Sequence, residues 1–108
     1  MMYEYLEDFF AGGMHQDWDL DGDGLEDIFR KRHSKSLDKS RIILQEIEMM
    51  LSSDLSEEEI DHLVTIEWRS GYEPDEDTET WRGVLRDMIG YIHDMHPELA
   101  DEAGKEKK

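Results

Sequence analysis

The apolar residues of this 108-residue chain recur three or four positions apart, and this spacing constrains the fold more than any other feature. Residues at i, i+3, i+4 and i+7 lie on one face of an α-helix, whereas a half-buried strand alternates apolar and polar residues. No run of the sequence alternates convincingly. The pattern therefore predicts an all-α fold, a compact single-domain bundle of about five helices, over about 2–11, 23–33, 36–53, 56–70 and 77–96.

Local signals place the starts of two of these helices. Ser56 followed by Glu59 has the pattern of a capping box, in which each side chain bonds the backbone of the other residue. Asp23 and Glu26 have the same spacing at the start of the second helix. We therefore expect Ser56 and Asp23 to be the N-caps of these two helices.

Other signals concern helix ends and the last helix. The pair 12–13 is Gly-Gly and is expected to end the first helix. Gly71 is expected to end the fourth in the left-handed conformation. Asp77 or Thr78 is expected to cap the last helix.

Composition limits the class of protein. The chain has no cysteine, which excludes disulfides and thiolate metal sites. Its first residues lack the basic and apolar regions of a signal peptide, and no stretch approaches the roughly 20 apolar residues of a membrane span. We expect a cytoplasmic protein in which residues 1–104 form one domain and the charged tail 105–108 frays.

The net charge of −17 is unevenly distributed. Residues 1–29 contain nine acidic residues and no Lys or Arg, whereas 30–41 contain six basic residues and one acidic residue. Such a surface repels nucleic acid and anionic membranes, so neither is expected as a partner. The charge favours a basic protein, and the basic segment is expected to pair with acidic neighbours within the fold.

The segment 19–27 matches part of a calcium-binding loop. Carboxylates at alternate positions with a glycine at the sharp turn form the ligand shell of an EF-hand. The twelfth position is Arg30, however, where the loop needs a bidentate Glu. We therefore interpret the segment as an acidic helix-capping loop and expect no cofactor. The alternative is a calcium-binding module with the ligands Asp19, Asp21, Asp23 and Asp27.

The histidines do not assemble a recognisable active site. His93 and His96 are three residues apart on the last predicted helix, but no third metal ligand accompanies them. His15 lies beside Asp17 without a nucleophile or a phosphate-binding loop nearby. The sequence therefore predicts a binding protein and not an enzyme, with no catalytic residues.

Three segments of the chain together carry a family resemblance. The most specific is FFAGGMHQDWD at 9–19, which contains the family motif His15, Gln16, Asp17 and Trp18. The others are SEEEI at 56–60, and GY at 71–72 followed by an acidic loop and TW at 80–81. Together these segments resemble the immunity proteins of bacterial contact-dependent growth-inhibition systems. Met14 stands where that family commonly has an aromatic residue.

The resemblance implies a helical protein that binds and neutralises one toxin domain delivered by neighbouring cells. An acidic inhibitor suits a basic toxin such as a nuclease, because opposite charges raise the encounter rate. Loops that join helices are exposed, so we expect the contacts there. The predicted contact residues are Trp18, Asp19, Asp21, Glu73, Asp75, Glu76 and Asp77.

Overall fold

The computed structural model describes residues 3–14, 24–72, 74 and 79–100, and every regular element within these ranges is helical. The helices are α1 (Glu4–Asp8), α2 (Leu25–His33), α3 (Leu37–Ser52), α4 (Glu57–His62) and α5 (Trp81–Met95). Two π-helical segments, Phe9–Gly13 and Leu63–Glu67, continue α1 and α4. The predicted all-α fold is confirmed, whereas the tail 105–108 lies outside the described residues.

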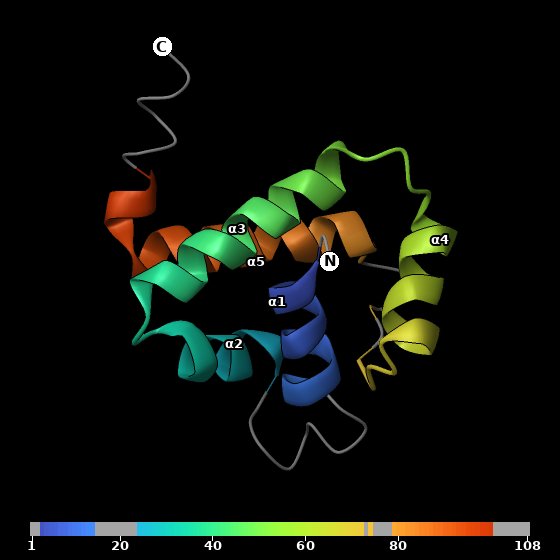
Figure 1. Cartoon of the computed structure of the whole chain (residues 1–108), viewed down its shortest axis with the longest axis horizontal. Coiled ribbons are helices and arrows are strands. Elements are labelled where there is room, and N and C mark those ends of the chain that lie inside the picture. The colour runs from blue at the N-terminus through green and yellow to red at the C-terminus, as the bar shows by residue number, and fades with distance from the viewer. Residues whose placement is uncertain (1–2, 15–23, 73, 75–78, 101–108) are drawn as a thin grey trace.

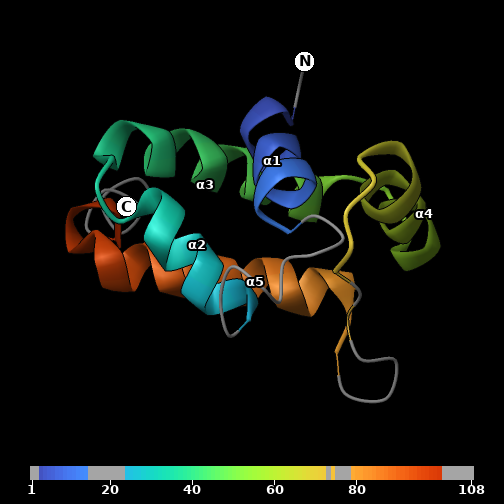
Figure 2. The same cartoon turned by 90° about the horizontal axis from the view of Figure 1, so that it is seen from below.

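The two longest helices, α3 and α5, lie side by side and run in opposite directions (Figures 1 and 2). Helix α1 packs against α3, and α2 packs against α5. Helix α4 lies at one end of the molecule, beside the start of α5, and the connection from α2 to α3 lies at the other end (Figure 1). Within the described residues, no helix is both long enough and apolar enough to cross a membrane.

Aromatic rings connect the helices through the core. Phe9 contacts Phe10 and Phe29 edge to face, with ring centroids 5.1 and 5.0 Å apart. Phe10 in turn lies 5.6 Å from Trp81, the first residue of α5. Edge-to-face rings at these distances add to the hydrophobic stabilisation. The rings of the first helical region therefore join α2 to α5, and all of them are buried.

Helix α3 has the extent and burial that the sequence predicts. Ser36 caps its start by accepting a hydrogen bond from the Lys39 amide, 3.2 Å away, and Ser53 is its C-cap. Ile43, Leu44 and Ile47 are buried, so the apolar side of the helix is wide. Such a helix contacts neighbours on more than one face, as its position between α1 and α5 requires.

The first helical region ends at the glycine pair 12–13, as the sequence predicts. The chain passes through both glycines in a π-helical turn, closed by the Met14 amide bonding the Phe9 carbonyl at 3.0 Å. The reason for Gly13 is packing, because an added Cβ would lie 2.9 Å from Cδ of Arg32. The expected helix end is therefore confirmed at Gly13, with Met14 as the C-cap, and the close approach of Arg32 explains this glycine.

The start of α1 is capped from another helix. Its N-cap residue, Tyr3, makes no side-chain cap. Instead, the carboxylate of Glu46 on α3 accepts hydrogen bonds from the amides of Leu6, at 2.8 Å, and Tyr5, at 3.2 Å. A negative charge is favourable at the positive end of a helix. Glu46 is only 6% exposed, so this carboxylate fixes α1 to α3 inside the fold.

The capping predictions have mixed outcomes. The capping box of Ser56 and Glu59 is present in both directions, and its hydrogen bonds from the Ser56 backbone and hydroxyl lower the pKa of Glu59. Helix α5 begins at Thr80, which caps the Gly83 amide at 2.9 Å, and not at Asp77 or Thr78. Thr80 lies beside the carboxylate of Glu57, which also bonds the first amides of α5.

The second helix begins later than predicted. Its N-cap is Gly24, whose backbone is extended and makes no side-chain cap. Glu26 is in the first turn, where its carboxylate pairs with Arg30 at 2.9 Å. The N-cap is therefore one residue later than predicted, and the predicted cap residue, Asp23, lies outside the described residues.

Candidate functional site

Most residues of the predicted site lie outside the described ranges. This holds for the family motif His15, Gln16, Asp17 and Trp18, for the contact residues Asp19, Asp21, Glu73, Asp75, Glu76 and Asp77, and for Asp23. Asp27 is described, and its carboxylate pairs with Lys31 at 3.1 Å in the first turn of α2. The structure instead shows how the chain is held where the two acidic segments, 15–23 and 73–78, begin and end.

A backbone bridge joins the residues from which both acidic segments start. The carbonyl oxygen of Met14 accepts hydrogen bonds from the Gly71 amide, at 2.7 Å, and from the Ser70 hydroxyl, at 2.9 Å. Met14 and Ser70 are buried. Segments 56 residues apart in the sequence therefore leave the described part of the chain at neighbouring points.

Arg69 turns the chain toward this bridge. Its φ of 59° is left-handed, whereas none of the described glycines is in the left-handed region. The expectation that Gly71 adopts the left-handed conformation was therefore wrong. Gly71 instead donates its amide to Met14. A left-handed residue other than glycine is uncommon, and here it lies between the π-helical segment that ends at Glu67 and the bridge.

An acidic pocket lies beside the second of these segments. We use this name for the pocket between α4 and the start of α5, with a volume of about 400 Å³. Four carboxylates and three other residues line it: Glu57, Glu58, Asp61, Pro74, Glu79, Thr80 and Trp81. In Figure 1 this is the end of the molecule at which α4 lies, opposite the connection from α2 to α3. The described part of the chain therefore concentrates negative charge at this end.

Hydrogen bonds position two carboxylates of the acidic pocket. Glu57 accepts from the amides of Trp81, at 2.7 Å, and Arg82, at 3.2 Å, so this residue of α4 caps α5. Asp61 accepts from the indole Nε1 of Trp81 at 2.9 Å. The ring of Trp81 is buried, and its one polar atom points to the pocket wall. Both acids are therefore structural as well as charged.

Tyr72 contacts two residues that line the pocket, Trp81 and Glu79. Its ring packs edge to face against Trp81, with centroids 6.1 Å apart, and its hydroxyl bonds Glu79 at 3.4 Å. Burial and then the Glu79 carboxylate raise the pKa of Tyr72 to about 12. The phenol therefore keeps its proton at neutral pH and donates it toward the carboxylate.

Arg82 fixes the turn from α3 to α4 behind the pocket. Its guanidinium donates to three backbone carbonyls, those of Leu51, Ser53 and Leu55, at distances of 2.6 to 3.2 Å. A guanidinium has five donors in a rigid fork, which suits such a cluster of acceptors. The sequence analysis missed Arg82, Glu57 and Glu46, because their partners are far away in the chain and no local pattern indicates them.

The basic segment 30–41 lies at the other end, where α2 ends and α3 begins. Arg30 pairs with Asp94 at 2.9 Å and with Glu26, and Arg32 pairs with Asp8 at 3.1 Å. Internal pairing of this segment was predicted and is confirmed. His96 bonds the carbonyl of His33 at 3.1 Å and is buried, so its role is structural.

These features define a small helical protein whose candidate site is an acidic surface for a partner. The chain matches the CdiI immunity protein family over residues 2–90 and belongs to that family. The resemblance found in the sequence is thereby confirmed, and the family identifies a toxin-neutralising immunity protein. No curated protein and no solved structure matches the chain.

Proposed function

We propose that this protein neutralises a basic toxin domain, such as a nuclease, by covering it with the acidic end of the molecule. The observation that carries the proposal is the match to the CdiI immunity protein family over most of the chain. The toxin is inhibited by binding alone, without chemical modification, in the cytoplasm of the cell that makes the immunity protein. The contact surface comprises the acidic pocket and the segments 15–23 and 73–78.

The distribution of charge supports this surface. Each of the two segments contains four acidic residues, and four more carboxylates line the acidic pocket. The bridge at Met14 holds the starts of the two segments together, and Pro74 and Glu79 border the pocket. Charges gathered on one side of a protein attract an oppositely charged partner and orient it before contact.

The packing behind the surface supports tight binding. Glu57, Asp61 and Arg82 connect α4, α5 and the turn between α3 and α4 through hydrogen bonds. A wall that is already ordered in the free protein loses little conformational entropy when it binds. Such a wall suits an inhibitor that must hold its toxin for a long time.

Charge reversal at exposed acids of the pocket tests the proposal. Glu58→Lys with Glu79→Lys changes two lining carboxylates without touching the capping bonds of Glu57. The matched control is Glu48→Lys with Glu98→Lys, two exposed acids that do not line the pocket. The probe is the toxin domain encoded beside this protein, and the rate of association is measured together with protection of cells.

We expect the pocket variant to associate at least tenfold more slowly at low salt and the control variant about twofold more slowly. The difference should shrink as salt rises, because exposed charges are screened beyond roughly 10 Å at 0.1 M. Reversal at Asp19 and Asp21, or at Glu73, Asp75, Glu76 and Asp77, should also weaken protection more than reversal at Lys31 and Lys35. Equal effects of pocket and control variants would contradict the proposed surface.

A further inference from the structure

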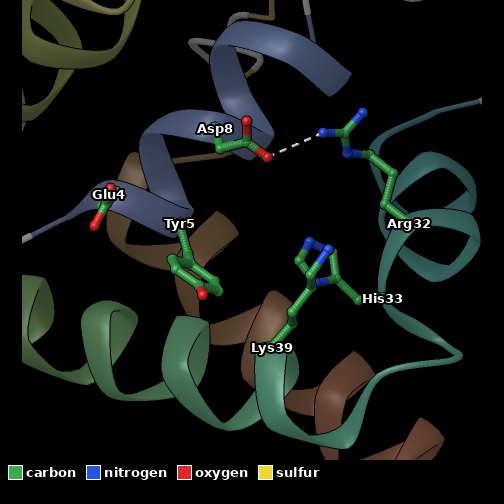
Figure 3. Close-up of a pocket in the computed structure, with 6 residues that line it drawn as sticks. All are labelled: Glu4, Tyr5, Asp8, Arg32, His33 and Lys39. Atoms are coloured by element: carbon green, nitrogen blue, oxygen red, sulfur yellow. Dashed lines mark hydrogen bonds and ion pairs between the residues drawn. The ribbon is translucent and has the colours of Figure 1, made fainter.

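A second pocket lies away from the acidic pocket, where α1, α2 and the first turn of α3 meet (Figure 3). Its volume is about 520 Å³, within the range of roughly 300–1,000 Å³ that is usual for binding pockets. Six residues line it: Glu4, Tyr5, Asp8, Arg32, His33 and Lys39. The proposed function uses none of them.

His33 supplies a buried polar atom that lacks a partner. It is only 6% exposed, and its ring packs against Phe29, with centroids 4.7 Å apart. Its Nδ1 atom has no hydrogen bond to any described residue. Burial, followed by the charge of Arg32, lowers the pKa of His33 to about 4, so the ring is neutral at pH 7. A buried polar atom without a partner is costly, and a turn of the ring toward a polar group bound in the pocket would satisfy it.

Two cations lie on the same side of the pocket as His33. Arg32 is held by its ion pair with Asp8 and by its close packing on Gly13 (Figure 3). Lys39 forms no ion pair with a described carboxylate. It lies in the first turn of α3, where the helix dipole is positive. The α2–α3 side of the pocket therefore favours an anionic group.

The opposite side limits how much negative charge the pocket accepts. Glu4 and Asp8 lie on α1, and Asp8 is already paired with Arg32. The four charged residues of the lining sum to zero, so a dianion such as phosphate meets repulsion from Glu4. A single negative charge directed at Lys39 and His33 fits this distribution.

We propose that this pocket binds a carboxylate presented by an Asp or Glu side chain of the toxin. Lys39 and Arg32 attract the carboxylate, and His33, in the neutral form with its proton on Nδ1, donates a hydrogen bond to it. The inference rests on the proposed function, because the toxin supplies the ligand. On a chain with a net charge of −17, this pocket is the place where an acidic group of a basic partner is accommodated.

Matched charge reversals test the role of the pocket in toxin binding. Lys39→Glu reverses a lining residue, whereas Lys35→Glu makes the same change at an exposed residue between α2 and α3 that does not line the pocket. We expect the dissociation constant for the toxin to rise at least tenfold in Lys39→Glu and less than threefold in Lys35→Glu. Replacing the matching toxin carboxylate by Lys should restore affinity to Lys39→Glu alone. Equal losses of toxin affinity in the two variants would overturn the proposed role of the pocket. They would show that only the overall charge of this region matters.

A second measurement needs no toxin. Sodium acetate is added while the ring nitrogens of His33 are followed by NMR, with sodium chloride at equal ionic strength as control. We expect acetate, but not chloride, to shift the Nδ1 resonance, and Lys39→Glu to abolish the shift. No shift with acetate would overturn carboxylate binding.

The two experiments separate the possible failures. An acetate shift with unchanged toxin affinity in Lys39→Glu would assign the pocket to a free carboxylate and overturn the toxin side chain as its ligand. A second outcome is that the double variant Glu58→Lys with Glu79→Lys loses toxin affinity while Lys39→Glu keeps it. That result would support the proposed function and overturn this inference. Failure of the unaltered protein to bind the toxin would overturn the proposed function itself, and the inference with it, whatever acetate does.

Discussion

Helices α1 and α5 both begin at a glutamate that belongs to another helix, yet the two glutamates lie in different surroundings. Glu46 is 6% exposed, and α1 has no side-chain cap of its own. The side chain of Glu57 is 42% exposed, and α5 keeps Thr80 as a second cap. The same chemical contact is therefore buried at the start of α1 and partly exposed, beside the acidic pocket, at the start of α5.

Removing Glu46 should produce the largest effect. In Glu46→Ala the amides of Tyr5 and Leu6 lose their acceptor at a largely buried site, and α1 has no side-chain cap of its own to replace it. We expect the free energy of unfolding to fall by about 3 kcal/mol. Urea denaturation measures the change, with Glu48→Ala on the exposed side of the same helix as control. A loss below about 1 kcal/mol, the usual net value of one hydrogen bond, would show that water replaces the carboxylate.

Acid should weaken the end of the molecule that contains His33. Its folded pKa of about 4 lies below the ordinary value of 6.5, so the unfolded chain binds the proton more readily. The stability is therefore fully present above pH 6.5 and is lost as the pH falls toward 4. We expect a loss of about 2 kcal/mol between pH 7 and pH 5.

His33→Phe serves as the control for this pH dependence. Phe is apolar like the neighbours Phe9 and Phe29, so the variant retains much of the packing. Its stability, measured by denaturation at several pH values, should vary less than that of the unaltered protein between pH 7 and pH 5. If the free energy of unfolding changes equally with pH in both proteins, the pH dependence comes from groups other than His33.

Removing Glu57 should have a smaller effect than removing Glu46. In Glu57→Ala the amides of Trp81 and Arg82 lose a carboxylate, but Thr80 still caps the Gly83 amide and water has access to this end. We expect the free energy of unfolding to fall by about 1 kcal/mol, the usual value of a helix cap. Glu58→Ala, which removes a neighbouring carboxylate that caps nothing in the described structure, is the control. Equal losses for Glu46→Ala and Glu57→Ala would contradict the comparison.

Calcium should not stabilise the protein through the acidic loop that precedes α2. Gly24 is its N-cap, and the carboxylate of Asp27 is paired with Lys31. Arg30 occupies the position where a calcium loop needs its bidentate ligand. We expect millimolar Ca²⁺ or a chelator to leave the melting temperature unchanged. A rise of several degrees that is lost in Asp21→Asn with Asp23→Asn would favour a calcium-binding module instead.

The starts of helices could be predicted where the capping residue and the amide that it bonds lie within one turn of each other. Ser36 and Ser56 begin α3 and α4 because each hydroxyl bonds an amide three residues later, a contact that the sequence alone specifies. The first helix and α5 were placed less accurately. Gly13 is needed for the approach of Arg32, and Thr80 lies where α5 meets Glu57, so tertiary contacts decide both.

The sequence predicts the negative charge of the candidate site. It does not predict how the carboxylates are arranged in space. The acidic composition and the segments 15–23 and 73–78 are evident in the sequence, as is the resemblance to immunity proteins. The carboxylates of the acidic pocket on α4 were not selected as site residues, because charged residues in a first helical turn are common and stabilise the helix in their own right. Only the packing of α4 against the start of α5 brings Glu58, Asp61 and Glu79 around one pocket.

The bridge between Met14 and Gly71 has a consequence for how the protein can evolve. It is made by a backbone carbonyl and a backbone amide, with only the Ser70 hydroxyl added. Backbone groups do not depend on the side chains that follow them in the sequence. Substitutions in 15–23 and 73–78 therefore leave the fixed points of both segments intact. Under the proposed function, a change of partner made through these segments would leave this backbone bridge in place.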